Sequence, residues 1–112
     1  MKKFVFIYYG GTESVETAEN VQKYTMEEIM ADWGKWFEEL GSALVDGGNP
    51  FNYGAQSVSK DGAEEIKSGP ATGYTIVNAE SMEAAVEMAK GCPSHKHMDG
   101  KAVVQVYEAM PM

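Results

Sequence analysis

A helix that stops at a glycine and leads at once into a short strand and a turn is the feature that most constrains the fold of this chain. It occupies residues 33–51. The helical part ends at Gly41, a residue type that readily adopts the left-handed conformation of a helix end. Leu44 and Val45 then indicate a short strand, which residues 46–50 close with turn-forming side chains.

The sequence also predicts where that helix starts. Thr25 and Glu28 form a capping box, in which the two side chains satisfy amide groups left free at a helix start. Apolar residues then recur with helical spacing and predict one buried face. That face comprises Met26, Ile29, Met30, Trp33, Phe37 and Leu40, with Trp36 at its edge.

The first strand is predicted over residues 3–9, which are aromatic and β-branched and end at Gly10-Gly11. Both alternate sets of its side chains are apolar, so we expect an inner strand that is covered on both faces. The short apolar run and the absence of a small-residue cleavage pattern favour a strand of the mature protein over a signal peptide. Strand, helix and strand then make one β-α-β unit, with a loop over residues 12–23.

The second half of the chain repeats this order. Residues 55–66 predict two short peripheral strands around Asp61-Gly62, a pair suited to a hairpin turn. After a loop over 67–73, residues 74–78 predict a strand, Ser81 caps a second helix that ends at 91–93, and 102–108 predict the last strand. We therefore predict one α+β domain over residues 1–112, a ferredoxin-like β-α-β-β-α-β sandwich with an extra hairpin.

That topology leaves one face of the sheet without helices, and here such a face would be apolar. The residues available to it, whichever set points outward, are Val5, Ile7, Val77, Val103 and Tyr107. Because monomers rarely expose a large apolar patch, we expect a homodimer that packs sheet against sheet.

Charge excludes several classes of partner. The 112 residues carry a net charge of -8, which repels nucleic acid and anionic membrane surfaces. All nine basic residues are lysine, so the chain has no arginine to grip a phosphate in two bonds. No apolar run approaches the roughly 20 residues of a membrane helix. With Cys92 as the single cysteine, we expect a protein of the reducing cytoplasm.

Several segments resemble the YCII-related group of the dimeric α+β barrel superfamily. They are the strand over 2–10, Trp33-Gly-Lys-Trp-Phe-Glu-Glu-Leu-Gly41, Leu44-Val-Asp-Gly-Gly48, Gly73-Tyr-Thr-Ile-Val77, Ala89-Lys-Gly-Cys-Pro93 and Val104-Gln-Val-Tyr-Glu-Ala-Met110. The group's Asp-Gly-Pro-Phe signature survives only as Ser68-Gly-Pro-Ala71, as in a divergent member. The resemblance implies the dimeric α+β barrel fold and a homodimer. Some relatives in the wider superfamily are small-molecule isomerases, monooxygenases or chlorophenol-pathway proteins.

One branch of that group carries a histidine near the start of the first helix, in a pair with an aspartate. Here the corresponding position is Met30 or a neighbour, and no histidine precedes His95. That pair therefore cannot be carried over to this chain, and candidate residues must come from the sequence itself.

The first candidate is an aromatic pocket between the first helix and the sheet, of the composition usual for a small-ligand site. Its predicted ligand-binding residues are Tyr8, Trp33, Trp36, Asn49, Phe51 and Tyr53, with Asp46 as a possible proton carrier. The alternative is that these tryptophans are core packing and that Asp46 forms a turn.

The second candidate is His95-Lys-His-Met-Asp99, which we expect in an exposed loop. If this segment were extended, His95, His97 and Asp99 would share one side and could hold iron or zinc. The alternative is a solvated loop without metal, and we predict no cofactor. His97 is also a possible proton carrier, whereas the position of Cys92 after a helix end favours packing over thiolate chemistry.

Two functional hypotheses follow. The first is a small-molecule-binding protein or cofactor-free enzyme that acts on an apolar or aromatic metabolite. The second is a non-catalytic dimeric accessory domain with a filled core. A cavity lined by Trp36, Asp46 and Tyr53 favours the first hypothesis, and a packed interior favours the second.

Overall fold

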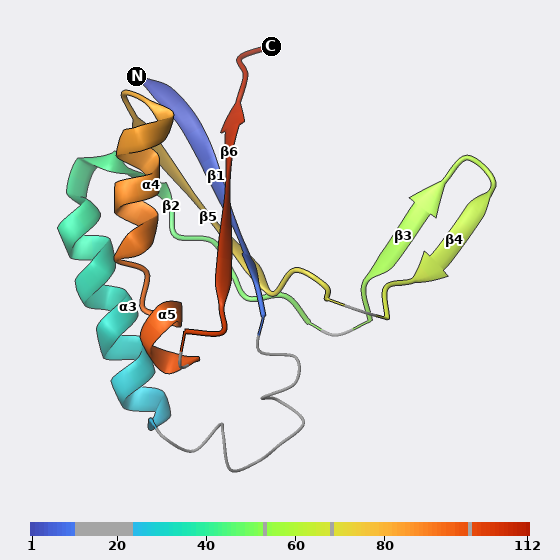
Figure 1. The fold of residues 1–112 in the computed structure, drawn as a ribbon, viewed down its shortest axis with the longest axis horizontal. Helices are drawn as coiled ribbons and strands as arrows, with labels where there is room; N and C mark the ends of the chain where they lie inside the picture. The colour runs from blue at the N-terminus through green and yellow to red at the C-terminus, as the bar shows by residue number, and fades with distance from the viewer. Residues whose placement is uncertain (11–23, 53, 68, 99) are drawn as a thin grey trace.

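The computed structural model describes residues 1–10, 24–52, 54–67, 69–98 and 100–112. Two helices cover one face of a four-stranded antiparallel sheet, and a hairpin projects from the other side (Figure 1). The elements are β1 (Lys2–Tyr9), α3 (Met26–Leu40), a 3-10 turn (Gly41–Ala43), β2 (Leu44–Asp46), β3 (Gln56–Ser59), β4 (Gly62–Glu65), β5 (Gly73–Ala79), α4 (Met82–Lys90), α5 (Ser94–His97) and β6 (Val103–Ala109). The predicted ferredoxin-like α+β fold is confirmed.

The sheet is ordered β2-β5-β1-β6, so β1 lies at its centre. Phe4, Phe6 and Tyr8 point toward the helices and are buried. The alternate set of β1 lies on the opposite face, where Val5 is opposite Ile76 on β5 and Tyr107 on β6. That face is only partly buried in the single chain, so the prediction of a first strand covered on both faces is wrong for one copy. We call it the bare face.

The register also decides which predicted residues belong to the bare face. It carries Lys3, Val5, Ile7 and Tyr9 of β1, Tyr74, Ile76 and Asn78 of β5, and Val103, Gln105, Tyr107 and Ala109 of β6. Val77, which we had included among the available residues, points the other way and is fully buried. Val77 belongs to the core between the sheet and the helices.

Helix α3 begins as predicted. The amide of Thr25 donates to Glu28 Oε1 at 2.9 Å, and the amide of Glu28 donates to Thr25 Oγ1 at 3.1 Å. Its buried face is different from the predicted one, because Met26 and Met30 are 72% and 65% exposed, whereas Trp36 is only 3% exposed. The helix is rotated so that Trp36 stacks on Phe6 of the sheet at 6.3 Å between ring centroids.

Helix α4 completes the same layer. Ser81 caps it, since Ser81 Oγ accepts a hydrogen bond from the amide of Ala84 at 3.2 Å. Ala85 and Ala89 are buried against the core. Met82 and Val86 lie at the margin of this face and are 40% and 37% exposed. None of the described helices is long and apolar enough to cross a membrane.

The predicted hairpin forms, but its turn is shifted by one residue. Ser59 pairs with Gly62, so the turn residues are Lys60 and Asp61 rather than Asp61 and Gly62. This hairpin stands away from the body of the molecule (Figure 1), and we call it the arm. The radius of gyration is 15.1 Å, compared with about 13 Å for a compact chain of this length. The predicted loop over 12–23 lies outside the described residues.

Gly48 allows the turn after β2 to approach the neighbouring strand. Its φ is +79°, and a Cβ at this position would lie 1.7 Å from the carbonyl oxygen of Tyr74. Gly54 is a natural control, because its φ is +91° but a Cβ there would meet no described atom within 4 Å. Both positions carry the backbone penalty of a side chain at positive φ, whereas only Gly48 adds a steric clash.

We therefore expect Gly48→Ala to lower the free energy of unfolding by at least about 1 kcal/mol more than Gly54→Ala does, a typical cost of overpacking. Urea denaturation followed by tryptophan fluorescence measures both values. Equal losses in the two variants would contradict the close approach of Gly48 to β5.

Candidate functional site

The sheet separates the residues of the predicted aromatic pocket. Tyr8 packs on the helix side, where its ring meets the ring of Trp33 edge-on at 5.5 Å. Phe51 stacks instead on Tyr74, which points to the bare face. Asn49 is exposed, and Tyr53 lies outside the described residues. The described members of the predicted pocket therefore do not line one common cavity.

Trp36 is a core residue. Its indole Nε1 donates to the carbonyl oxygen of Met88 on α4 at 3.3 Å, and its ring contacts Trp33 and Phe37. This is the core-packing alternative that the sequence left open. Only the edge of Trp36 reaches a surface groove, which is described below.

Asp46 acts as a turn former. Its Oδ1 accepts a hydrogen bond from the amide of Gly48 at 2.8 Å, which is the geometry of an Asx turn. The residue is exposed at the end of β2 opposite Ile76 of the bare face, whereas Trp36 packs on Phe6 on the helix side. The structure thus gives Asp46 the second of its two predicted roles.

A buried polar network lies where β1 and β5 meet. The hydroxyl of Tyr8 donates to Thr75 Oγ1 at 2.5 Å, and Thr75 Oγ1 donates to the carbonyl oxygen of Gly47 at 2.9 Å. Burial raises the pKa of the Tyr8 phenol far above its usual range. Tyr8 therefore stays neutral at physiological pH and orients Thr75 without supplying a charge.

The segment with the two histidines is a helix rather than the expected loop. Residues 94–97 form α5, which follows directly after Pro93. Because this backbone is helical, His95 and His97 do not share one side. His95 Nε2 lies 3.1 Å from the carbonyl oxygen of Ala89, whereas His97 turns toward α3.

His97 forms a pair with Asp32 of α3. The distance from His97 Nε2 to Asp32 Oδ2 is 2.8 Å, and the side chain of His97 is only 7% exposed. Lys96 Nζ also donates to Asp32 Oδ2, at 3.1 Å, and lies over the ring of Tyr24. These two donors hold the pKa of the Asp32 carboxyl below its usual range, with His97 the larger cause.

The ionised Asp32 decides which ring nitrogen of a neutral His97 carries the proton. A carboxylate only accepts hydrogen bonds, so a neutral His97 must carry its proton on Nε2. The other ring nitrogen, Nδ1, then has a free lone pair. This is how an aspartate prepares a histidine for proton transfer in acid-base sites.

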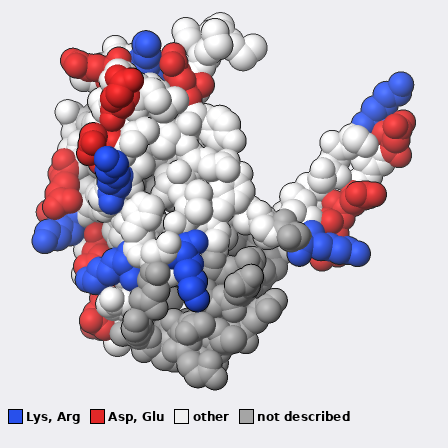
Figure 2. Space-filling view, in the orientation of Figure 1, with Lys and Arg blue, Asp and Glu red and all other residues white. Residues whose placement is uncertain are grey.

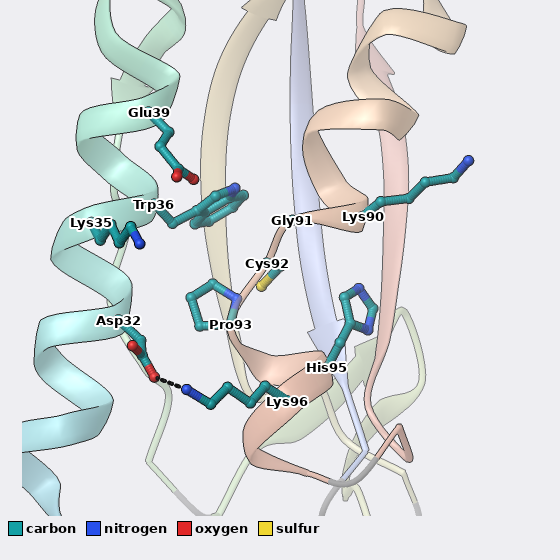
Figure 3. Close-up of a pocket in the computed structure, with 10 residues that line it drawn as sticks. All are labelled: Asp32, Lys35, Trp36, Glu39, Lys90, Gly91, Cys92, Pro93, His95 and Lys96. Atoms are coloured by element: carbon teal, nitrogen blue, oxygen red, sulfur yellow. Dashed lines mark hydrogen bonds and ion pairs between the residues drawn. The ribbon is translucent and has the colours of Figure 1, made fainter.

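A groove of about 330 Å³ borders this pair between α3 and the end of α4 (Figure 3). It is lined by Asp32, Lys35, Trp36, Glu39, Lys90, Gly91, Cys92, Pro93, His95 and Lys96. In Figure 3, Lys96 of α5 reaches across to Asp32 of α3 and closes one end of the groove. His97 does not line the groove but contacts Asp32, which does.

Cys92 is a packed residue at the floor of the groove. It is 2% exposed, and its Sγ lies 3.1 Å from Ser94 Oγ. Burial raises the pKa of its thiol, which favours the thiol over the reactive thiolate. The role predicted for Cys92 from the sequence agrees with this environment.

Asp99, the third residue of the weak metal candidate, lies outside the described residues. Over the part of the chain that the structure describes, no group of three or more histidine, cysteine, aspartate and glutamate side chains is placed to hold a metal ion. The extended conformation on which the metal hypothesis depended is absent from 94–97.

Sequence reasoning missed the partner of His97. Asp32 is not among the residues of the predicted buried face of the first helix, and it lies 65 positions before His97. The available signal was the topology: two antiparallel helices on one face bring the end of the second helix beside the start of the first.

No family model matches this chain, and no curated protein matches its sequence. Among solved structures, the chain is similar to 5-chloro-2-hydroxyhydroquinone dehydrochlorinase (TftG) from Burkholderia phenoliruptrix AC1100, in complex with 2,5-dihydroxybenzoquinone, with a TM-score of 0.56. The match covers 96% of this chain and 93% of that chain at 16% sequence identity. This likeness shows a shared fold over nearly the whole length of both chains.

The ion pair at Asp32 gives a pH-dependent contribution to stability. A carboxyl whose pKa is lower in the folded state stabilises the fold above its unfolded pKa, about 4. The contribution is lost as the pH falls through the lower folded value. We expect Asp32→Asn to be less stable than the unaltered protein at neutral pH, and to lose less further stability on acidification from about pH 4 to pH 2.

Urea unfolding at a series of pH values measures this difference. The control is Glu39→Gln, which neutralises another carboxylate of the same helix and groove, one that accepts no hydrogen bond from His97 or Lys96 among the described contacts. Parallel acid profiles for Asp32→Asn and the unaltered protein would refute the role assigned to the pair.

Proposed function

We propose that this protein is a divergent member of the YCII-related group and a cofactor-free enzyme that transfers protons on a small hydroxylated aromatic ring. The observation that carries the proposal is the His97–Asp32 pair, with its 2.8 Å hydrogen bond and a His97 side chain that is only 7% exposed. A histidine oriented by a carboxylate is the usual equipment of general acid-base catalysis. In the YCII-related branch described above the helix supplies the histidine, whereas here α3 supplies the aspartate.

The groove supports the class of substrate. Its volume of about 330 Å³ is at the lower end of the range for small-molecule sites and suits a single ring. The edge of Trp36 offers an aromatic contact, and the amine of Lys35 favours an ionised phenol or hydroxyquinone. The amines of Lys90 and Lys96 are paired with Glu87 and Asp32. The structural relative named above was solved in complex with 2,5-dihydroxybenzoquinone, a ligand of this chemical class.

The proposed chemistry needs no redox partner. In the loss of hydrogen chloride from a chlorinated trihydroxybenzene, one phenolic proton moves to the ring carbon that bears chlorine. A second phenolic proton is removed as chloride leaves with its bonding electrons, and the product is a hydroxyquinone. His97 Nδ1 is the assigned proton acceptor, and Asp32 stabilises the imidazolium that forms.

The test measures chloride release from 5-chloro-2-hydroxyhydroquinone together with calorimetric binding of 2,5-dihydroxybenzoquinone. We expect His97→Gln to lower the rate by about 100-fold or more, the usual contribution of general acid-base catalysis, with ligand affinity changed only a few-fold. His95→Gln is the matched control, because His95 lines the groove but bonds to a backbone carbonyl instead of Asp32.

Two results would overturn the proposal. Equal rates in the His97→Gln and His95→Gln variants would remove His97 as the proton carrier. An unaltered protein that neither binds the quinone nor releases chloride would remove this substrate class.

The proposal includes a homodimer joined through the bare face. Val103 and Tyr107 of that face are 52% and 54% exposed in the single chain, and their neighbours Val5, Ile7 and Ile76 extend the same apolar surface. A surface of this kind in a monomer is a common site of association.

Tyr107→Arg places a charge in the middle of the proposed interface. We expect the unaltered protein to be a dimer and Tyr107→Arg a monomer at micromolar concentration, as measured by size-exclusion chromatography with light scattering. Met30→Arg is the control, since Met30 is 65% exposed on the helix layer and should leave the dimer intact. A monomeric unaltered protein would exclude the proposed dimer.

A second candidate function is a non-catalytic dimeric accessory domain. The tight packing of Trp36 against Phe6 and α4 favours it, because this packing fills the space where the sequence suggested a ligand pocket. A protein that dimerises but shows neither quinone binding nor chloride release would fit this second function.

A further inference from the structure

The β3–β4 arm has almost no packing of its own. All eight of its strand residues are exposed, and Val58 is 77% exposed. The two strands pair only with each other. A solitary two-stranded hairpin is marginally stable in water, so a partner is needed to hold it in a defined conformation.

The side chains of the arm fall on two different faces. Val58 and Ala63 are cross-strand partners and share one face with Gln56 and Glu65. The other face carries Ser57, Ser59 and Glu64 near the tip. Val58 is a large apolar residue, so burial of the first face gives the larger favourable free energy, at about 25 cal/mol for each Å² of apolar surface removed from water.

The position of the arm relates it to the bare face. In Figure 1 the helices lie on one side of the sheet and the arm extends on the other, so any molecule that covers the bare face lies beside the arm. Lys60 at the tip is five positions along the chain from Ala55 at the base, which is roughly 17 Å of strand. Packed sheets lie about 10 Å apart, so the arm is long enough to pass the interface and reach the body of a covering molecule.

Charge favours a second copy of this chain as the covering molecule. On β5, β1 and β6 the bare face carries one charged residue, Lys3 at its end, and on the edge strand β2 Asp46 lies opposite Ile76, in a chain with 17 acidic residues. In Figure 2 the charged side chains gather over the helices, at the ends of the sheet and on the arm, while the surface over the middle of β6 is uncharged. Two copies with a net charge of -8 each can meet through such a face without placing like charges opposite one another.

The exposed area also fits a partner of this size. The chain exposes 7930 Å², about 1,800 Å² more than the roughly 6,100 Å² expected for a compact monomer of its mass. A standard interface removes about 800 Å² from each partner. The exposed strands of the arm contribute to this excess.

We propose that the arm is a dimer clasp: in the homodimer proposed above, the Val58 face of β3–β4 packs against the body of the second copy. The inference rests on that homodimer and adds a second contact region to its interface. The arm is then ordered by the partner, and its two strands belong structurally to the neighbouring subunit.

Matched substitutions on the two faces of one strand test the clasp. Val58→Asp places a carboxylate on the proposed contact face, and Ser57→Asp places the same group on the opposite face. Sedimentation velocity over a dilution series gives the dimer dissociation constant of each variant. We expect Val58→Asp to raise it at least tenfold and Ser57→Asp to change it less than threefold.

Hydrogen-deuterium exchange supplies an independent readout. The arm amides should be protected in the unaltered dimer and should exchange rapidly in the monomeric Tyr107→Arg variant, while β1 and β5 stay protected. If the unaltered protein is dimeric but the two arm variants have equal dissociation constants, the clasp is wrong and the sheet-face dimer stands. If the unaltered protein is monomeric, the homodimer fails and the clasp fails with it.

Discussion

The indole of Trp36 is the contact on which the rest of the structure depends. It stacks on Phe6 of the central strand, and its Nε1 donates to the carbonyl oxygen of Met88 near the end of α4. One side chain thus joins both helices and the sheet. Gly91 permits the close approach of α4, because a Cβ at that position would lie 3.3 Å from Trp36 Nε1. This contact sets the rotation of α3, which in turn aims Asp32 at α5.

The sheet divides the molecule into two regions with different roles. On the helix side, a packed aromatic core supports a polar groove and the His97–Asp32 pair. On the other side lie a face with few charged side chains and a projecting arm. The acid-base pair and the proposed dimer surface are therefore separated by the thickness of one sheet. Substitutions on one side are expected to leave the other largely unaffected.

Local signals in the sequence predicted the elements well, because their physical causes lie within a few residues. The capping box at Thr25 and the cap at Ser81 form as the sequence indicates. The rotation of α3 was not predicted, since helical periodicity placed Met26 and Met30 on the buried face and Trp36 only at its edge. Only the tertiary contacts with Phe6 and Met88 favour Trp36 as the buried residue.

The candidate site was less predictable for the same reason. His97 was identified as a possible proton carrier, but its helix has four residues, too few to show an apolar period. Asp46 and Trp36 were grouped because they are close in sequence. In the fold, Asp46 lies in the turn after β2 and Trp36 lies in the core. The partner of His97 could be found only by placing two distant helices side by side.

The 65-residue separation of Asp32 and His97 has a consequence for folding. Contacts between distant residues require most of the chain to be in place, and they form late compared with local structure. The acid-base pair therefore exists only after both β-α-β units have docked. A nascent chain that has not yet exposed α5 contains a formed first helix but no paired carboxylate. A ligand of the groove would bind only after both units have docked, and its binding would stabilise the docked arrangement.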